Sequence, residues 1–489
     1  MLRVSLTFLA VAVAGLFVAD IEITTADPWA EFARMAMGAV TPDFTQTERL
    51  AEVMYQTVAF ALLGVAVANA FGFALALVFH LRAVRVGCAF ARAIHELFWA
   101  LIFLQIFGLS PWTGLLAIAI PYSGIIAKVY SEILDETDQA PMRAAPAGSG
   151  RVSVFLFARL PDAWVHLRTY SMYRLECGLR SSAVLGFVGL PTLGFQIESA
   201  YRIGNYSEVS ALLLLFYAVV ATMRLWMRKR LLPVYLIAAL FVLAGGADIS
   251  LANIARFFSE DIVPAPIRAA GGFDGAALGA WLWHLLAEQA APGIVNTVVL
   301  TMIALVASGV VTLVAFPLIS PKFVGGGGRA VGHVMLVVAR TTPEYILAYV
   351  FLQLWGPSMA PAIAALSLHN GAIIGHLIGR RTESMASRPD SPRGLNLYAY
   401  EILPRVYPQF LAFLFYRWEI IMRETAILGI LGIPTLGFYI DSAFADIRYD
   451  RAVLLILVTA LLNIAVDAAS RHIRARLRLK TTPDPTGHG

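Results

Sequence analysis

The sequence predicts an all-α protein that crosses a membrane many times. Hydrophobic residues make up 59% of its 489 positions and charged residues only 14%, and a soluble fold could not bury that much apolar surface. Several stretches of about 18 to 25 residues carry almost no charge, which is the length that crosses a bilayer as a helix. A transmembrane β-barrel would show short alternating segments instead.

About twelve such segments are predicted, six in each half of the chain. They are residues 3–19, 53–79, 93–109, 112–131, 171–197, 207–227, 231–249, 293–319, 331–353, 358–378, 412–439 and 452–470. With six segments each, both halves enter the membrane in the same direction. The first segment resembles a secretory signal peptide. The comparable segment at 231–249 cannot be one, so we expect the first segment to be retained.

Charges between the segments indicate the orientation. Residues 20–52 carry seven acids and two bases, whereas the run "RLWMRKR" at 224–230 is strongly basic and the tail 471–480 holds five bases. Basic loops face the cytoplasm of a membrane protein, so both termini are expected there. The net charge of +5 therefore reflects topology, and we expect the bilayer, not nucleic acid, as the partner.

The two halves repeat one phrase. Residues 181–200, "SSAVLGFVGLPTLGFQIESA", match residues 424–443, "ETAILGILGIPTLGFYIDSA", at twelve of twenty positions. Just upstream, "YRLECGLR" (Tyr173–Arg180) is matched by "YRWEIIMR" (Tyr416–Arg423) at the same spacing. Such a match over neighbouring segments indicates a duplication followed by fusion.

The repeat extends over most of the chain. Thr57 and Thr297, for example, occupy matching places at the start of the second span of each half. We predict a first six-helix repeat at residues 1–230 and a second at 231–489, which also carries the basic C-terminal tail. Two parallel repeats in one chain enclose a path along their pseudo-twofold axis, normal to the membrane.

Three glycines and one proline recur in the repeated phrase. The candidate gate residues are Gly186, Gly189, Pro191, Gly194, Gly429, Gly432, Pro434 and Gly437. Small residues allow close helix packing, which is one interpretation. Proline beside three glycines also predicts a bend, and irregular backbone occurs in a membrane only where it lines a cavity or is buried in protein. We expect a bend that forms a gate.

Charged residues lie inside or at the ends of predicted spans. They are Glu96, Arg174, Glu176, Arg180, Glu344, Arg417, Glu419 and Arg423. Each charge costs about 2.5–3.5 kcal/mol at mid-membrane, so each needs a partner or water. Glu176 and Arg180 are four residues apart, as are Glu419 and Arg423, and each pair can neutralise itself on one helix face. Alternatively, these residues line the route of a charged solute, and the arginines would suit an anion.

The sequence carries no constellation that predicts catalysis, a cofactor or a metal site. The two cysteines, Cys88 and Cys177, form no CxxC motif. "HELFW" at His95 begins like a zinc-protease motif, but Trp99 replaces the second histidine. No ATP-binding motif is present either. We therefore expect that the chain is not an enzyme.

The polar segment between the fourth and fifth spans resembles the coupling loop of ABC importer permeases. In that family a glycine is followed twelve residues later by Leu-Pro, as Gly148 is by Leu160 and Pro161. In the second half Leu403 and Pro404 match, with a serine at the glycine position. The resemblance implies that these residues form two loops that dock on a cytoplasmic ATPase.

A closer resemblance is to the phosphonate-type permeases of that class. "YRWEIIMRETAILGILGIPTLGFYIDSA" follows their pattern of a "YRFE" helix and a Gly-rich phrase, with Pro-Thr in place of a Gly-Gly pair. The resemblance covers nearly the whole chain, twice, although members of the family are usually single six-span chains that dimerise. It implies the type I importer fold.

The resemblance also implies a function. The chain would be the membrane-spanning subunit of an ATP-driven importer in the bacterial inner membrane, carrying a phosphonate or related phosphorus oxyanion. Its partners would be two copies of an ATPase and an extracytoplasmic solute-binding protein. Two alternatives stay open: a permease of the same type for an amino acid, iron or another oxyanion, and a secondary transporter driven by an ion gradient.

Overall fold

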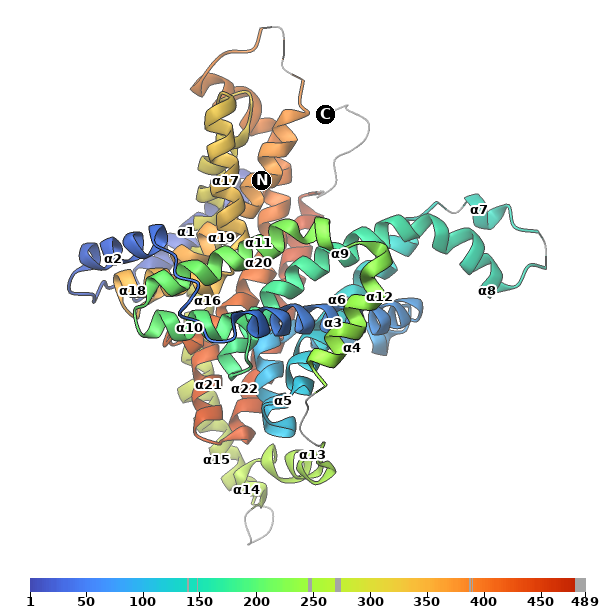
Figure 1. Cartoon of the computed structure of the whole chain (residues 1–489), viewed down its shortest axis with the longest axis vertical. Helices are drawn as coiled ribbons and strands as arrows, with labels where there is room; N and C mark the ends of the chain where they lie inside the picture. The colour runs from blue at the N-terminus through green and yellow to red at the C-terminus, as the bar shows by residue number, and fades with distance from the viewer. Residues whose placement is uncertain are drawn as a thin grey trace. The chain divides into compact units, whose positions relative to one another are not determined.

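The computed structural model describes residues 1–138, 140–146, 148–244, 249–268, 274–386, 388 and 390–479. Within these ranges every regular element is a helix (Figure 1), so the predicted all-α class is confirmed. The contacts divide the chain into two compact units. We call Arg34–Asp261 the 34–261 unit, and Met1–Ala33 together with Ile262–Gly489 the 262–489 unit.

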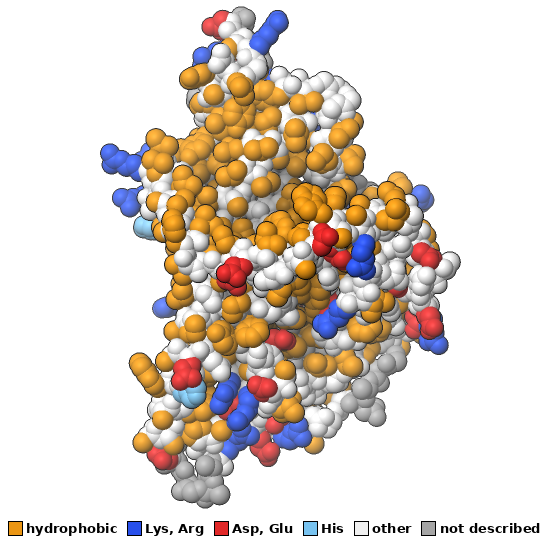
Figure 2. All heavy atoms as spheres, turned by 90° about the vertical axis from the view of Figure 1, so that its left-hand side faces the viewer, with side chains coloured by type: hydrophobic (Ala, Val, Ile, Leu, Met, Phe, Trp, Pro, Cys, Tyr) orange, Lys and Arg blue, Asp and Glu red, His pale blue; other side chains and the backbone are white. Residues whose placement is uncertain are grey.

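The multi-pass membrane class is confirmed as well. Six helical segments of the described chain are long and apolar enough to span a membrane, and nine if each of three sharply bent helix pairs counts as one span. The predicted total of twelve therefore stays a prediction. Many large hydrophobic side chains are exposed, and Figure 2 shows broad areas of them on one face. Such areas suit contact with lipid.

The 34–261 unit is built around three long helices, α3, α6 and α9. Its first α-helix, α2 (Pro28–Val40), begins before the unit boundary at Arg34. The others are α3 (Leu50–Leu77), α4 (Arg82–Ala93), α5 (Glu96–Phe107), α6 (Pro111–Glu136), α7 (Ala140–Arg143), α8 (Arg151–Val154), α9 (Leu160–Val184), α10 (Leu193–Arg202), α11 (Tyr206–Trp226), α12 (Leu232–Val242) and α13 (Leu251–Arg256). Helices α3 and α6 pack closely, because a Cβ on Gly72 of α3 would lie only 2.6 Å from the Ile126 side chain of α6.

The 262–489 unit also contains a closely packed pair of long helices. Its α-helices are α1 (Leu2–Leu16), α14 (Ala265–Arg268), α15 (Gly275–Leu285), α16 (Ala291–Ala315), α17 (Gly326–Thr341), α18 (Glu344–Trp355), α19 (Met359–Glu383), α20 (Leu403–Ile430), α21 (Leu436–Ala445) and α22 (Tyr449–Arg476). Here α16 and α19 are the closely packed pair, since a Cβ on Gly371 would lie 2.6 Å from the side chain of Val311.

The compact units differ from the predicted repeats, 1–230 and 231–489, because α1 belongs to the 262–489 unit and α12 to the 34–261 unit. The ring of Phe8 in α1 lies 5.1 Å from that of Phe415 and 5.2 Å from that of Trp418, both in α20. Helix α12 packs on α3, where Leu236 covers Ala59 and its neighbours. The first apolar helix of each predicted repeat thus packs in the compact unit that holds most of the other predicted repeat. Only a narrow face of each helix is buried, around Ala12 in α1 and Ala239 in α12.

The fifth span of the 34–261 unit begins about twenty residues before the predicted start at 171. The helical backbone is continuous from Arg151 through a π-helical turn, Phe155–Arg159, into α9. Leu160 and Pro161, expected in a loop, are the first residues of α9. The sequence-based expectation was wrong because proline is accepted in the first helical turn, where its missing N–H is not needed. Pro404 follows a π-helical turn in the same way in α20.

Candidate functional site

Each unit contains a bend in its fifth span, and in both units pairs of glycines let the two helices of the bend touch. In the 34–261 unit the helical segment that ends at Val188 meets α10 at 54°. A Cβ on Gly194 would overlap the carbonyl oxygen of Ala183, and a Cβ on Gly186 would overlap the backbone nitrogen of Phe195. Only glycine allows this backbone contact.

The 262–489 unit has the same contact between α20 and α21. A Cβ on Gly437 would overlap the carbonyl oxygen of Ala426, and one on Gly429 would overlap the backbone nitrogen of Phe438. Both interpretations of the glycines, bending and close packing, therefore hold for the same backbone.

The remaining glycine of each phrase turns the chain. Gly189 and Gly432 both have φ +85, the left-handed region that favours glycine. Pro191 and Pro434 follow two residues later, after the helix has ended. The predicted bend is thus present in both units.

A threonine from a neighbouring helix holds each bend. The Thr57 hydroxyl of α3 accepts the N–H of Leu193, the first residue of α10, at 2.8 Å. The Thr297 hydroxyl of α16 accepts the N–H of Leu436, the first residue of α21, at 3.0 Å. Each hydroxyl donates its own hydrogen to a carbonyl in its own helix. These two threonines, matched in the sequence repeat, therefore cap the helix that follows the bend.

Replacing Thr297 by valine should destabilise the 262–489 unit by about 1 kcal/mol, the usual cost of losing a cap, because the buried N–H of Leu436 loses its acceptor. Thr57→Val should have the same effect in the 34–261 unit, and the double variant should show the sum of both. Thermal unfolding of the detergent-solubilised protein measures this. Thr297→Ser is the control and should retain full stability; equal loss in that variant would mean that the methyl group, not the hydroxyl, matters.

The third span of each unit is broken directly before a predicted intramembrane acid. Helices α4 and α5 meet at 91°, and α17 and α18 meet at 97°. Glu96 and Glu344 are the first residues of α5 and α18. A carboxylate is favoured there because the positive end of the helix dipole faces it. The structure thus places these two acids at equivalent sites.

In the 34–261 unit Glu96 belongs to a hydrogen-bonded group that we call the Glu96 cluster: Glu96, Tyr122 and Ser181. The Ser181 hydroxyl donates to Glu96 Oε1 at 2.6 Å and lies 2.9 Å from the Tyr122 hydroxyl. His95 Nδ1 accepts the N–H of Leu97, so its Nε2, which lies 3.8 Å from Glu96 Oε2, carries the hydrogen of the neutral ring. Each of these contacts pairs a donor with an acceptor.

The 262–489 unit has a different group around the matching glutamate, which we call the Glu344 cluster: Glu344, His369, Asn370 and Glu424. In the repeat, Asn370 stands where Tyr122 stands and Glu424 where Ser181 stands. Asn370 Nδ2 donates to Glu424 Oε2 at 3.1 Å, and His369 Nε2 lies 3.9 Å from Glu344 Oε2. Two carboxylates and an imidazole thus meet in a buried site.

Sequence reasoning found Glu96 and Glu344 but missed the side chains they meet. Glu424 lies inside the predicted span 412–439. A charge inside a predicted span is the property by which Glu96 and Glu344 were chosen. It was overlooked because its partner in the repeat, Ser181, carries no charge. His369 and Asn370 come from the fourth span, and only the packing of α18, α19 and α20 brings them to Glu344.

The predicted arginines have separate surroundings. The Arg174 guanidinium lies 5.1–5.6 Å from the ring centres of Tyr122, Tyr170 and Tyr173, and its Nε donates to the Tyr170 hydroxyl at 2.7 Å. Aromatic faces of this kind stabilise a buried cation. Arg417, its counterpart in the repeat, is half-buried, and its Nε has no hydrogen-bond partner among the described residues.

The ion pair predicted within α9 is not formed. Among the described residues no hydrogen bond or ion pair joins Glu176 to Arg180. Arg180 Nη2 instead donates to Cys177 Sγ at 3.4 Å. The spacing of four residues allows the contact but does not direct either side chain toward the other. Glu419 and Arg423 both have partners.

The predicted coupling loop of the 34–261 unit lies at the tip of a helical hairpin formed by α6 and α9 (Figure 1). Gly148 is exposed with φ +93, and Pro161 is exposed at the start of α9. In the 262–489 unit Leu403 is half-buried and Pro404 is exposed at the start of α20. Both prolines are therefore accessible to a partner.

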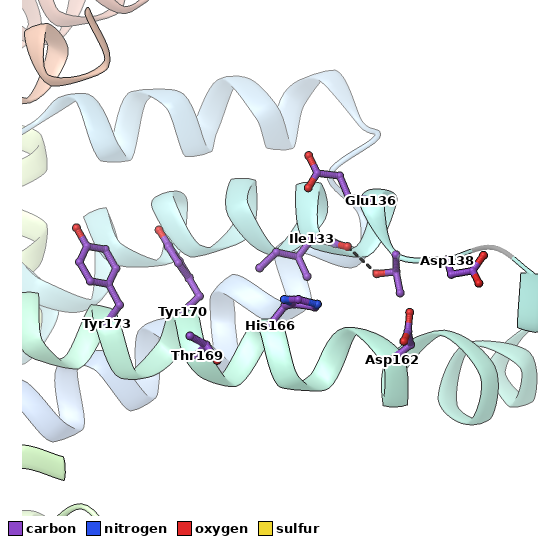
Figure 3. Close-up of a pocket in the computed structure, with 9 residues that line it drawn as sticks. Ile133, Glu136, Asp138, Asp162, His166, Thr169, Tyr170 and Tyr173 are labelled. Atoms are coloured by element: carbon purple, nitrogen blue, oxygen red, sulfur yellow. Dashed lines mark hydrogen bonds between the residues drawn. The ribbon is translucent and has the colours of Figure 1, made fainter. Parts of the chain in front are cut away.

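A cleft of about 510 Å³ lies between α6 and α9, next to this loop. Figure 3 shows Glu136 and Asp138 on one side of it and Asp162 and His166 on the other. All four side chains are exposed. The cleft thus presents three carboxylates to solvent, a surface that suits a basic partner.

Two comparisons with known proteins bear on this architecture. The phosphate-import permease protein PhnE of Mycolicibacterium smegmatis is 26% identical over 424 residues, which cover 80% of this chain and 77% of that protein. The phosphite transport system permease protein PtxC of Stutzerimonas stutzeri is 30% identical over 231 residues, 45% of this chain and 83% of that protein. The chain belongs to the phosphonate-type family of ABC importer permeases. No family model and no solved structure matches it.

Membership of the permease family gives the chain its class of function. It is a multi-pass membrane permease subunit of a transport system, and its relatives are permease subunits rather than enzymes. The predicted resemblance to phosphonate-type permeases is confirmed. The roles of single residues are proposals.

Proposed function

We propose that the chain forms the whole membrane path of an ATP-driven importer for a phosphorus oxyanion such as phosphate, phosphite or a phosphonate. The names of the relatives support this class of solute. In this proposal the chain lies in a bacterial inner membrane with both termini in the cytoplasm and hydrolyses no ATP itself. A separate solute-binding protein delivers the solute from outside.

Twelve spans in two parallel repeats complete the proposal. The apolar helices α1 and α12 would each begin one repeat, and each packs within the compact unit that holds most of the other repeat. A relative covered over 83% of its length matches only 45% of this chain, which supports two family-length halves in one polypeptide. The two bends would act as the gate, because the same glycine contact occurs at matching places in both units.

Two ATPase subunits would dock on the segments around Gly148, Pro161 and Pro404. Both prolines are exposed, so their surroundings are free to contact another protein. Near the first of them the cleft with Glu136, Asp138 and Asp162 offers negative charge. We expect the ATPase to present a basic side chain there.

Arg417 is the residue we propose to meet the oxyanion. A half-buried guanidinium whose Nε lacks an acceptor among the described residues is unusual, since buried polar groups are normally satisfied. A phosphorus oxyanion offers acceptors that arginine binds by charge-assisted hydrogen bonds. Its counterpart Arg174 is already surrounded by tyrosines, so the two sides of the path would differ.

Reconstitution tests the proposed function. The full chain is placed in liposomes with the ATPase and binding protein encoded by neighbouring genes, and uptake of labelled phosphate and phosphite is measured with and without ATP. ATP-dependent uptake is expected, and Arg417→Gln should reduce it while Arg478→Gln, a change in the C-terminal segment, should not. Uptake by the chain alone, driven by a proton gradient, would overturn the proposal and favour a secondary transporter.

A further inference from the structure

The hydrogen on His369 can be placed from its neighbours. Nδ1 of His369 lies 2.9 Å from the carbonyl oxygen of Thr342. A carbonyl oxygen only accepts, so Nδ1 carries the hydrogen and donates it. In the neutral ring Nε2 then presents a lone pair, and it faces Glu344 Oε2 at 3.9 Å. A lone pair and a carboxylate repel each other, so this arrangement calls for a cation between them.

The surroundings of this contact add further oxygen donors. Glu424 contributes a second carboxylate from α20, and with it three ligand atoms lie within 4.8 Å of one another. Asn370 is fully buried, and its Oδ1 has no hydrogen-bond partner among the described residues. Nδ2 of the same amide donates to Glu424 Oε2 at 3.1 Å and to the carbonyl oxygen of Leu366 at 3.0 Å, so Asn370 holds the second carboxylate in place.

We propose that Glu344, His369 and Glu424 bind a divalent metal ion. The neutral imidazole and two carboxylates carry a charge of −2, which such an ion balances. Metal-bound histidines usually donate their second ring N–H to a carboxylate, a backbone carbonyl or water, and His369 donates to the carbonyl of Thr342. Ligand atoms about 2.0–2.2 Å from one ion lie at most about 4.4 Å apart, so a small side-chain rotation closes the site.

The other unit supplies a natural comparison. At the matching places the Glu96 cluster has Ser181 and Tyr122, and the Ser181 hydroxyl donates to Glu96. Pro121 stands at the place of His369, and His95, which lies beside the Glu96 cluster, turns an N–H rather than a lone pair toward Glu96. The 34–261 unit therefore satisfies its carboxylate without a cation, and one ion per chain is expected.

Metal content and cobalt spectra test the site in the full-length protein. The detergent-solubilised chain is stripped with a chelator, dialysed and titrated with zinc, manganese and cobalt, followed by elemental analysis and by cobalt absorption. One equivalent per chain is expected. Glu424→Ser, which installs the residue of the other repeat, should weaken binding by more than the roughly 10–100-fold that loss of an outer-shell partner costs, and His369→Asn should do the same.

Ser181→Ala in the Glu96 cluster is the matched control and should bind metal as the unchanged chain does. Unfolding temperatures of all variants identify any that fail to fold. Should the unchanged chain bind no saturable metal, or should the folded Glu424→Ser variant bind as tightly as the unchanged chain, the proposal is wrong. If the unchanged chain binds no saturable metal, a proton on Nε2 of His369 takes the place of the proposed metal ion. Neither outcome depends on uptake, so the proposed function stands or falls separately.

Discussion

Replacing Gly194 or Gly437 by alanine should remove most of the folded protein from membranes. The added methyl group would overlap the carbonyl oxygen of Ala183 or Ala426, and a backbone oxygen cannot turn aside as a side chain can. The two helices of the bend would have to separate, at a cost of about 3 kcal/mol or more, the upper part of the range for overpacking. Size-exclusion chromatography measures the effect. It gives the yield of folded protein after solubilisation and, after heating samples to a series of temperatures, the unfolding temperature.

Two further glycines provide graded controls for this prediction. Gly87 in α4 has open space around it, so Gly87→Ala should be neutral or stabilise by up to about 1 kcal/mol. Gly432 also has open space but φ +85, so Gly432→Ala should cost about 1–2 kcal/mol through backbone strain alone. If Gly437→Ala were no worse than Gly432→Ala, the close contact of α20 with α21 would be refuted.

A lysine in place of Pro161 or Pro404 should uncouple the chain from the proposed ATPase, because near Pro161 its charge would repel the basic side chain expected beside Glu136, Asp138 and Asp162. Both prolines are exposed at the first turn of a long helix, and exposed substitutions usually change stability little, so the fold should be unchanged. Capture of the ATPase and ATP-dependent uptake should each fall at least roughly tenfold, equivalent to about 1.4 kcal/mol of docking free energy.

The control for docking introduces the same charge elsewhere in the same unit. Ile203 is 75% exposed in the turn between α10 and α11, on the side that the proposed topology places outside the cell. Ile203→Lys should leave ATPase capture intact. Undiminished capture by a folded Pro161→Lys, Pro404→Lys double variant would remove the docking proposal for both loops.

The sequence predicted the helical elements well because apolar length is a local property. Segments such as 53–79 and 112–131 overlap α3 and α6 almost completely. It predicted the start of α9 poorly. Pro161 indicated a loop, whereas a π-helical turn before it lets the helix run on from Arg151. Hydrogen bonding across several residues decided that boundary, and a single proline does not reveal it.

The candidate site was predicted in part. Glu96 and Glu344 were recognised because a charge within an apolar segment is costly. The glycines were recognised because they occur at matching positions in residues 181–200 and 424–443. Glu176 and Arg180 show the limit of spacing arguments, since a distance of four residues did not bring them together. The donors around Glu344 come from three separate helices, so no local pattern joins them.

By itself the sequence determined the membrane class, the duplicated phrase and the family resemblance, because these depend on composition and on matches along the chain. The tertiary structure alone decided that α1 packs in the 262–489 unit and α12 in the 34–261 unit, and that Gly194 touches Ala183. It also decided that His369 turns a lone pair toward a carboxylate. Each of these results rests on contacts between residues far apart in the chain, and such contacts form only when long helices pack against one another.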